Sequence, residues 1–224
     1  MADAQAAVKS IFHFGKRERI DLLVSWVTLS VAFAIVLMRV DFLGSFLKTS
    51  SAMTPEIAFP IGFIAVGTGF VFHELAHREA AKHYGFVSEF RAWYPMLGFA
   101  IVFATVTGWI LAAPGATYFM AQNVSRKQNG IISIAGPLIN IVLGFIFILL
   151  WIFVSGPLGT ILAAVAMINF WFAFFNLLPI LMLDGAKVLA WNPKIWVVGI
   201  FISGIMAFFP ELFLSLIGSF VSLA

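Results

Sequence analysis

Residues 57–77 read IAFPIGFIAVGTGFVFHELAH. The first sixteen carry no charge, and the run ends in three titratable side chains, His73, Glu74 and His77. An apolar run of this kind is typical of a helix that crosses a bilayer, where ionisable groups are costly and usually functional. The stretch therefore predicts a membrane helix with a functional site near one end.

The spacing of the two histidines indicates a metal site. On a helix, His73 and His77 lie on the same face and can point both imidazoles at one ion. With Glu74 between them they form the H-E-x-x-H arrangement, in which two histidines bind zinc and the glutamate is the general base for the water that zinc activates. The alternative is a helix end whose polar residues meet the lipid headgroups. Because two of the four histidines fall at this spacing around a glutamate, we favour the metal site.

The rest of the chain has the composition of a membrane protein. Of its 224 residues 62% are hydrophobic and 10% are charged, against about 25% charged in soluble domains. Residues 92–125 and 128–183 contain no Asp, Glu, Lys, Arg or His. We therefore expect an all-α polytopic membrane protein that forms a single domain over residues 1–224.

Two further features of the composition limit the function. The chain has no cysteine, so a metal must take nitrogen and oxygen ligands and disulfides are excluded. No basic stripe with interleaved aromatic residues is present, which argues against nucleic acid as a partner. The lipid bilayer is the expected partner.

The apolar runs predict about six transmembrane helices. Four are placed at residues 21–40, 57–84, 131–154 and 158–182, and residues 195–224 hold either two short helices or one broken helix. Lys and Arg collect on the cytoplasmic side of membrane proteins. The basic residues before the first span therefore place the N-terminus in the cytoplasm, and alternation places the HELAH end of the second span, with the active site, on the same side, which is most simply a cell membrane. In this topology only Arg39 and Lys48 among the basic residues lie outside.

The segment 92–125 is flanked by basic residues on both sides, so it should cross the membrane either twice or not at all. Its sequence GFAIVFATVTGWILAAPGATYF (98–119) is rich in Val, Ile, Thr and aromatic residues, which favour strands. We expect a re-entrant β-hairpin or small sheet here, sheltered by the helices, because open strands cannot face lipid. One irregular transmembrane helix is the alternative.

A catalytic zinc site needs a third protein ligand, and two acids compete for this role. Asp184 ends the chargeless run in NLLPILMLDGAK (176–187), where Pro179 breaks the helix and Gly185 permits close approach of the backbone. Glu89 follows the HELAH helix in a polar loop. We favour Asp184, because the predicted topology puts it on the same side of the membrane as the two histidines. Of the other candidates, His83 and the N-terminal His13 are expected to be solvated or interfacial, and Glu79 to point away from the site.

Asn140, in AGPLIN (135–140), is the buried polar residue of the third predicted span. Its amide could donate to the oxyanion that forms during hydrolysis, or it could make a packing hydrogen bond between helices. Asn169 and Asn176 are further polar candidates in the fourth span.

FHELAH (72–77), AGPLIN (135–140) and NLLPILMLDG (176–185) together resemble the site-2 protease family of zinc-dependent intramembrane metalloproteases. The resemblance covers about residues 57–190, and residues 21–40 and 195–224 would be gating or peripheral helices. It implies that His73, His77 and Asp184 bind one Zn²⁺, that Glu74 is the general base, and that Asn140 holds substrate or the oxyanion. It also implies a β-hairpin that binds the substrate as an added strand.

The resemblance thus predicts an endopeptidase that cleaves a transmembrane protein substrate within or near its helix. Two other functions remain open at this stage. One is a membrane protein that binds or transports zinc without catalysis. The other is a membrane HExxH peptidase whose third ligand is a glutamate, which would be Glu89.

Overall fold

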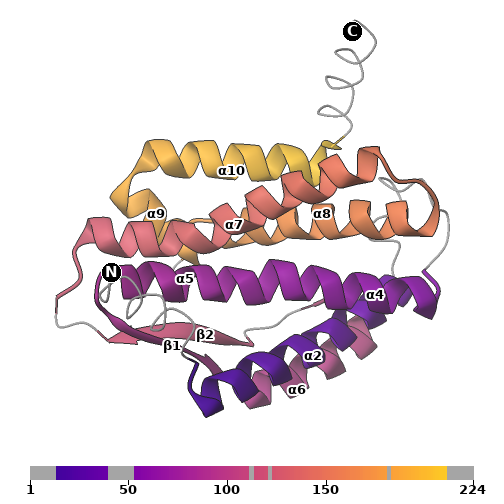
Figure 1. Cartoon of the computed structure of the whole chain (residues 1–224), viewed down its shortest axis with the longest axis horizontal. Coiled ribbons are helices and arrows are strands. Elements are labelled where there is room, and N and C mark those ends of the chain that lie inside the picture. The colour runs from indigo at the N-terminus through magenta and orange to yellow at the C-terminus, as the bar shows by residue number, and fades with distance from the viewer. Residues whose placement is uncertain (1–13, 40–52, 111–113, 121–122, 181–182, 211–224) are drawn as a thin grey trace, which may run out of the picture.

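The computed structural model describes residues 14–39, 53–110, 114–120, 123–180 and 183–210 (Figure 1). Helices dominate this part of the chain, and two strands pair beside them. The helices are α2 (Lys16–Arg39), α4 (Pro55–Val66), the π-helical turn η1 (Gly67–Val71), α5 (Phe72–His83), α6 (Tyr94–Thr107), α7 (Arg126–Ile152), α8 (Gly156–Asn176), α9 (Asp184–Trp191) and α10 (Pro193–Phe208). The strands are β1 (Val87–Ala92) and β2 (Gly115–Met120).

Four helical segments are long and apolar enough to cross a membrane: Lys16–Arg39, Pro55–His83, Arg126–Ile152 and Gly156–Asn176. The second of these joins α4, η1 and α5 into one run of 29 residues. The four correspond to the first four predicted spans. The predicted total of about six is not reached among the described residues, because α10 has 16 residues and so extends only about 24 Å, and residues 211–224 lie outside the described part.

A two-stranded antiparallel sheet follows the HELAH helix, as predicted, but only β2 lies in the segment whose composition favoured strands. The prediction of a hairpin within residues 92–125 is wrong for most of the segment, because Tyr94–Thr107 is a helix. The strands lie on either side of this helix, with Val87 paired to Met120 and Ala92 to Gly115. The alternative of one transmembrane helix is also wrong, since α6 has 14 residues and is about 21 Å long.

Helix α6 forms despite its strand-favouring composition because its ends and its surroundings favour a helix. Pro95 stands in the first turn, and Gly108 ends the helix in the left-handed conformation with φ 73°. Val, Ile and Thr cost a helix only some tenths of a kcal/mol each. A helix satisfies its own backbone hydrogen bonds in apolar surroundings, whereas a hairpin would leave an edge unpaired there.

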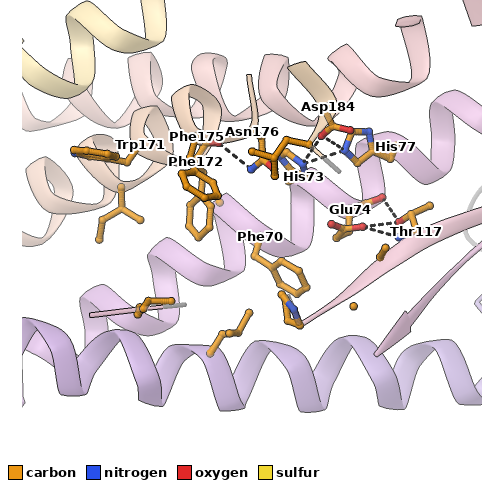
Figure 2. Close-up of a pocket in the computed structure, with 18 of the residues that line it drawn as sticks. Phe70, His73, Glu74, His77, Thr117, Trp171, Phe172, Phe175, Asn176 and Asp184 are labelled. Atoms are coloured by element: carbon orange, nitrogen blue, oxygen red, sulfur yellow. Dashed lines mark hydrogen bonds and ion pairs between the residues drawn. The ribbon is translucent and has the colours of Figure 1, made fainter. Parts of the chain in front are cut away.

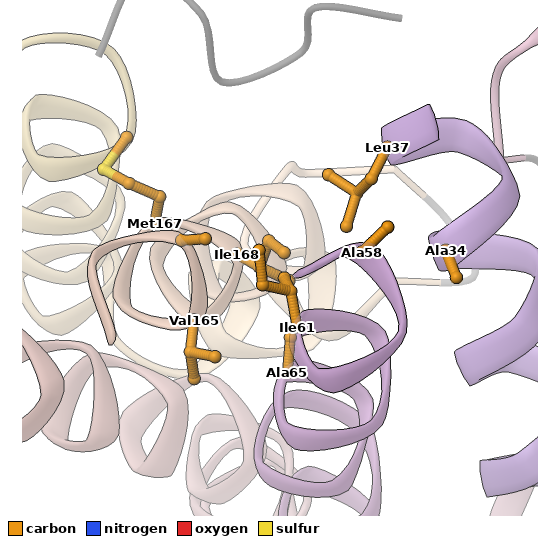
Figure 3. Close-up of a cluster of buried hydrophobic side chains, with 9 residues drawn as sticks. Ala34, Leu37, Ala58, Ile61, Ala65, Val165, Met167 and Ile168 are labelled. Carbon is orange, nitrogen blue, oxygen red and sulfur yellow. The ribbon is translucent and has the colours of Figure 1, made fainter. Parts of the chain in front are cut away.

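Small residues allow the long helices to pack closely. Ala34 of α2, Ala58 and Ala65 of α4, and Ala164 of α8 are fully buried in one cluster with Ile61 (Figure 3). In a membrane the hydrophobic effect does not drive helices together, because lipid tails are as apolar as the side chains. Close van der Waals packing between small residues stabilises their association instead. The cluster fixes α4 against α2 and α8, and so fixes where the η1–α5 continuation carries the histidines.

Candidate metal centre

The two histidines of α5 converge on one point. His73 and His77 are buried, with 4% and 8% of their surface exposed. Their Nε2 atoms lie 3.0 Å apart. Both side chains leave the same face of α5, as the spacing of four residues predicts.

Asp184 comes to the same point from the far end of the chain. Helix α8 ends at Asn176, and α9 begins at Asp184. Asp184 Oδ2 lies 3.3 Å from His73 Nε2 and 3.0 Å from His77 Nε2 (Figure 2). The start of α9 packs closely against the end of α8, since a Cβ added at Gly185 would lie 2.1 Å from the backbone oxygen of Leu177. Only glycine fits there without moving Asp184.

The hydrogen bonds of the histidines determine which nitrogen faces the centre. His77 Nδ1 lies 2.7 Å from the carbonyl oxygen of Ile132, so Nδ1 must carry the proton and donate it. His73 Nδ1 lies 2.6 Å from Asn140 Oδ1, and the Asn140 amide nitrogen donates to the Gly69 carbonyl at 2.8 Å, so His73 Nδ1 is again the donor. In both neutral rings the Nε2 lone pair therefore points at the Asp184 carboxylate. Three acceptors that converge in this way need a cation between them.

The distances suit zinc. With bonds of 2.0–2.1 Å to histidine nitrogen and carboxylate oxygen, the edge of a zinc tetrahedron is about 3.4 Å. The three ligand atoms are separated by 3.0 to 3.3 Å. Among the described residues, His73, His77 and Asp184 form a group whose ligand atoms all lie within 4.8 Å of one another. The donor set of two imidazoles and one carboxylate leaves a fourth position for water or substrate.

The surroundings keep the Asp184 carboxyl in the form that binds metal. Burial alone would raise its pKa, but positive charge on the facing imidazoles of His77 and His73 outweighs this effect and holds the pKa below its ordinary value. A cation bound between neutral rings would act in the same direction. The carboxyl is therefore ionised at neutral pH, as a metal ligand must be.

Asn140 is also brought to the centre, but not in the predicted position. It is fully buried behind His73. Its Oδ1 accepts from the His73 imidazole, and its Nδ2 donates to the Gly69 carbonyl at 2.8 Å and to Asn169 Oδ1 at 3.3 Å. Because both amide hydrogens are committed, the predicted contact with substrate or oxyanion does not fit this geometry. Asn140 is placed to orient His73 instead, as outer partners of metal-bound histidines do.

Glu74 lies beside the centre and is held by strand β2. Its Oε2 accepts hydrogen bonds from the Thr117 backbone nitrogen at 2.9 Å and from the Thr117 hydroxyl at 2.8 Å. Figure 2 shows Glu74 turned toward Thr117, apart from the two histidines and Asp184. The carboxylate therefore borders the site without being one of the three converging ligands.

The other titratable candidates lie elsewhere. Glu89 is on β1, where it pairs with Arg91 and has a side chain 45% exposed. It does not belong to the ligand group, so among the two competing acids the structure brings only Asp184 to the histidines. His83 is exposed and stacks edge-on against Tyr84. Glu79 pairs with Arg78, and His13 lies outside the described residues.

A cavity of about 710 Å³ opens in front of the centre. His73, Glu74, His77 and Asp184 line one part of it, and β2 residues 115–119 line another. Most of the remaining wall is apolar and aromatic, and includes Phe70, Phe172 and Phe175 (Figure 2). The cavity is therefore shaped for an apolar chain lying against a strand and a metal site.

Sequence reasoning missed three residues that shape this site. Thr117 holds Glu74, and Lys187 lies 3.4 Å from Asp184 Oδ1, the carboxylate oxygen that faces away from the histidines. The third residue is Gly136, in the AGPLIN segment. A Cβ at Gly136 would lie 2.5 Å from His77 Nε2 and 2.6 Å from His73 Nε2, so glycine keeps the ligand atoms clear. Of these three residues, only Lys187 could have been found from the sequence, because it lies three residues after Asp184 and so on the same face of a helix.

Comparisons with known proteins agree with this chemistry. No family model matches the sequence, and no solved structure matches it significantly. A protein of Methanocaldococcus jannaschii named "putative zinc metalloprotease" is 42% identical over 202 residues, which cover 89% of this chain and 97% of that protein. A zinc metalloprotease of the same organism is 26% identical over 141 residues, which cover 62% of this chain and 36% of that protein. By the identity and coverage of the first relative, the chain belongs to the zinc metalloprotease family.

Proposed function

We propose that the chain is an intramembrane endopeptidase of the site-2 protease type, which hydrolyses a peptide bond within or near a transmembrane helix of another protein. The observation that supports this most is the position of the ligands. His73 and His77 belong to a helical run long and apolar enough to cross a membrane, and Asp184 follows another such run. The chemistry would thus take place among membrane helices, within a catalytic core at about residues 57–190 of a single domain.

His73, His77 and Asp184 would hold one zinc ion. When bound, zinc supplies an activated water at neutral pH and polarises the carbonyl to be cleaved. Asn140 and the Ile132 carbonyl keep the two rings oriented, with Nε2 toward the ion. Gly136 leaves room for the ion and its fourth ligand.

Glu74 is the proposed general base. Its carboxylate takes a proton from the attacking water as the carbon–oxygen bond forms. It then gives a proton to the amide nitrogen as the carbon–nitrogen bond breaks. Most of the cavity wall is apolar, and an apolar environment strengthens the electrostatic interactions of this carboxylate.

The substrate would bind as an extended segment along β2. A peptide bond in a helix is shielded by its hydrogen bonds, so the helix must unwind locally, and residues of low helix propensity near the bond make this easier. Strand β2 has β1 on one side only, and its residues line the cavity. An added strand there would satisfy the backbone groups of the unwound segment and place a bond before the metal ligands.

The proposal is tested with purified, zinc-loaded protein in detergent micelles. The substrate is a labelled single-span peptide with a Gly-Gly pair within its helix, and products are identified by mass spectrometry. We expect the wild type to cleave it. We expect Glu74→Gln to retain zinc and to lose activity by a factor of about 10² to 10⁴, and Glu89→Gln to retain both. Cleavage by Glu74→Gln at the wild-type rate, or no cleavage of any transmembrane peptide by the wild type, would contradict the proposal.

A further inference from the structure

The edge of the sheet that faces the cavity is occupied by Glu74. Thr117 and Phe90 are direct partners in the antiparallel register. The Phe90 backbone nitrogen donates to Glu18 Oε1 at 3.0 Å, and the Thr117 nitrogen donates to Glu74 Oε2 at 2.9 Å. Because both N–H groups point away from the partner strand, this is a non-hydrogen-bonded pair. The two edges of the sheet are thus each capped by a carboxylate from a helix.

Thr117, whose N–H is capped by Glu74, is the middle one of three β2 residues whose backbone N–H groups point away from β1. Backbone N–H groups alternate in direction along a strand, so Gly115, Thr117 and Phe119 direct theirs to the same edge. All three residues line the cavity that contains the metal ligands. A strand added to β2 would therefore need the Thr117 N–H, which the Glu74 carboxylate holds. One N–H cannot serve both acceptors.

We propose that the substrate strand displaces Glu74 from Thr117, so that occupation of the β2 edge releases the general base toward the metal site. This inference rests on the proposed function. Before binding, Glu74 closes the edge against unspecific strand pairing and is held apart from the ligands. After binding, a substrate carbonyl accepts the Thr117 N–H and the carboxylate is free to face the water. Only a segment that pairs with β2 then meets an active base.

The test compares two variants that both lack the base. In Glu74→Gln the amide oxygen can still accept from Thr117, whereas in Glu74→Ala nothing holds the N–H. The probe is the labelled transmembrane peptide that the wild type cleaves, and its dissociation constant is measured by fluorescence anisotropy with zinc present. We expect the peptide to bind Glu74→Ala roughly three- to tenfold more tightly than Glu74→Gln. Equal affinity, or weaker binding by Glu74→Ala, would overturn the proposal.

A double-mutant cycle separates displacement from the space that alanine opens. Thr117→Val keeps the shape and the backbone N–H of Thr117 and removes the hydroxyl that also holds Glu74. We expect it to tighten peptide binding in the Glu74→Gln background and to have a smaller effect in the Glu74→Ala background, where the hydroxyl keeps only the backbone carbonyl of residue 74, 3.0 Å away, as an acceptor. Thr117→Ser should behave as threonine in both. The same effect of Thr117→Val in both backgrounds would show that the hydroxyl acts by another route.

A measurement without substrate completes the test. Hydrogen exchange of the Thr117 amide should be faster in Glu74→Ala than in the wild type, and it should be unchanged in Glu89→Gln, whose carboxylate lies on the other strand. An unchanged rate in Glu74→Ala would rule out the capped edge even if no peptide were available. Failure of the proposed function looks different, because then the wild type does not cleave or Glu74→Gln still does.

Discussion

Each histidine of the metal centre is oriented through its Nδ1 by a different kind of acceptor. His77 donates to a backbone carbonyl, which no substitution removes, whereas His73 depends on the side chain of Asn140. The two ligands should therefore differ in their sensitivity to mutation.

Asn140→Ala should lower zinc affinity by a factor of about 10 to 100, because His73 loses its orienting partner. Asn169→Ala, one hydrogen bond farther from the ring, should have a smaller effect. Zinc affinity is measured by competition with a chelator of known affinity. If Asn140→Ala lost cleavage while binding zinc as tightly as the wild type, the residue would act on substrate instead.

Gly136→Ala should abolish zinc binding, since its Cβ would lie within 2.6 Å of both Nε2 atoms. The matched control is Gly98→Ala on α6, where an added Cβ meets nothing within 4 Å. That control should leave zinc content unchanged and alter the free energy of unfolding by at most about 1 kcal/mol, in the stabilising direction. Zinc is counted by plasma mass spectrometry of the purified proteins, and normal zinc in Gly136→Ala would show that the site is more open than described.

Among the elements, helix α2 is tied to the sheet by a buried acid. Glu18 is 2% exposed and accepts from Phe90 of β1 and, at 2.8 Å, from Arg78 of α5. The Phe14 ring covers the Arg78 guanidinium, and the distance from the ring centroid to Arg78 Cζ is 4.1 Å. The Glu18 carboxylate of α2 thus links this helix to α5, which carries the two histidines, and to β1, which pairs with β2.

Glu18→Gln should lower the free energy of unfolding by about 3 kcal/mol or more, because it breaks a buried ion pair from one side. Glu89→Gln should cost at most about 1 kcal/mol, since its ion pair with Arg91 is exposed. Thermal unfolding in detergent, followed by intrinsic tryptophan fluorescence, compares the two. Equal small losses would mean that α2 is held mainly by apolar packing.

The long helices run side by side across the molecule, so that the segments that connect them gather at its two ends (Figure 1). The sheet, α9 and the beginning of α7 lie together at the left in Figure 1, and the turn between α7 and α8 lies at the right. We propose that the left end is cytoplasmic, because the basic residues next to it outnumber those at the other end.

Single cysteines can test this orientation directly, because the chain has none of its own. Lys127→Cys, in the first turn of α7, should react with a membrane-impermeant maleimide only in inverted vesicles. Ser155→Cys, between α7 and α8, should react only in intact cells. Both positions are exposed. The reverse pattern would place the metal centre on the outer side.

Much of this molecule could be predicted from the sequence, and the failures have clear physical reasons. Long apolar runs determined four spans, and helical spacing brought His73 and His77 together, because both signals are local. Asp184 could be predicted as a ligand because the predicted topology placed it on the same side of the membrane as the two histidines. Strand β2 lies in the predicted segment, but β1 and α6 were missed, because Val, Ile and Thr do not decide between helix and strand once tertiary surroundings act. The roles of Asn140, Gly136 and Thr117 depend on contacts between segments distant in sequence, which no local pattern encodes.

The central claim is that one zinc ion is bound between two membrane-crossing segments by His73, His77 and Asp184. X-ray absorption at the zinc edge, together with zinc content, tests it most directly on the purified wild type and the Asp184→Ala and Glu89→Ala variants. We predict one zinc per wild-type chain, with two imidazole nitrogens and only oxygen otherwise in its shell at 2.0–2.2 Å, and loss of zinc in Asp184→Ala but not in Glu89→Ala. A wild type without zinc, or an Asp184→Ala variant with an unchanged zinc shell, would contradict the account.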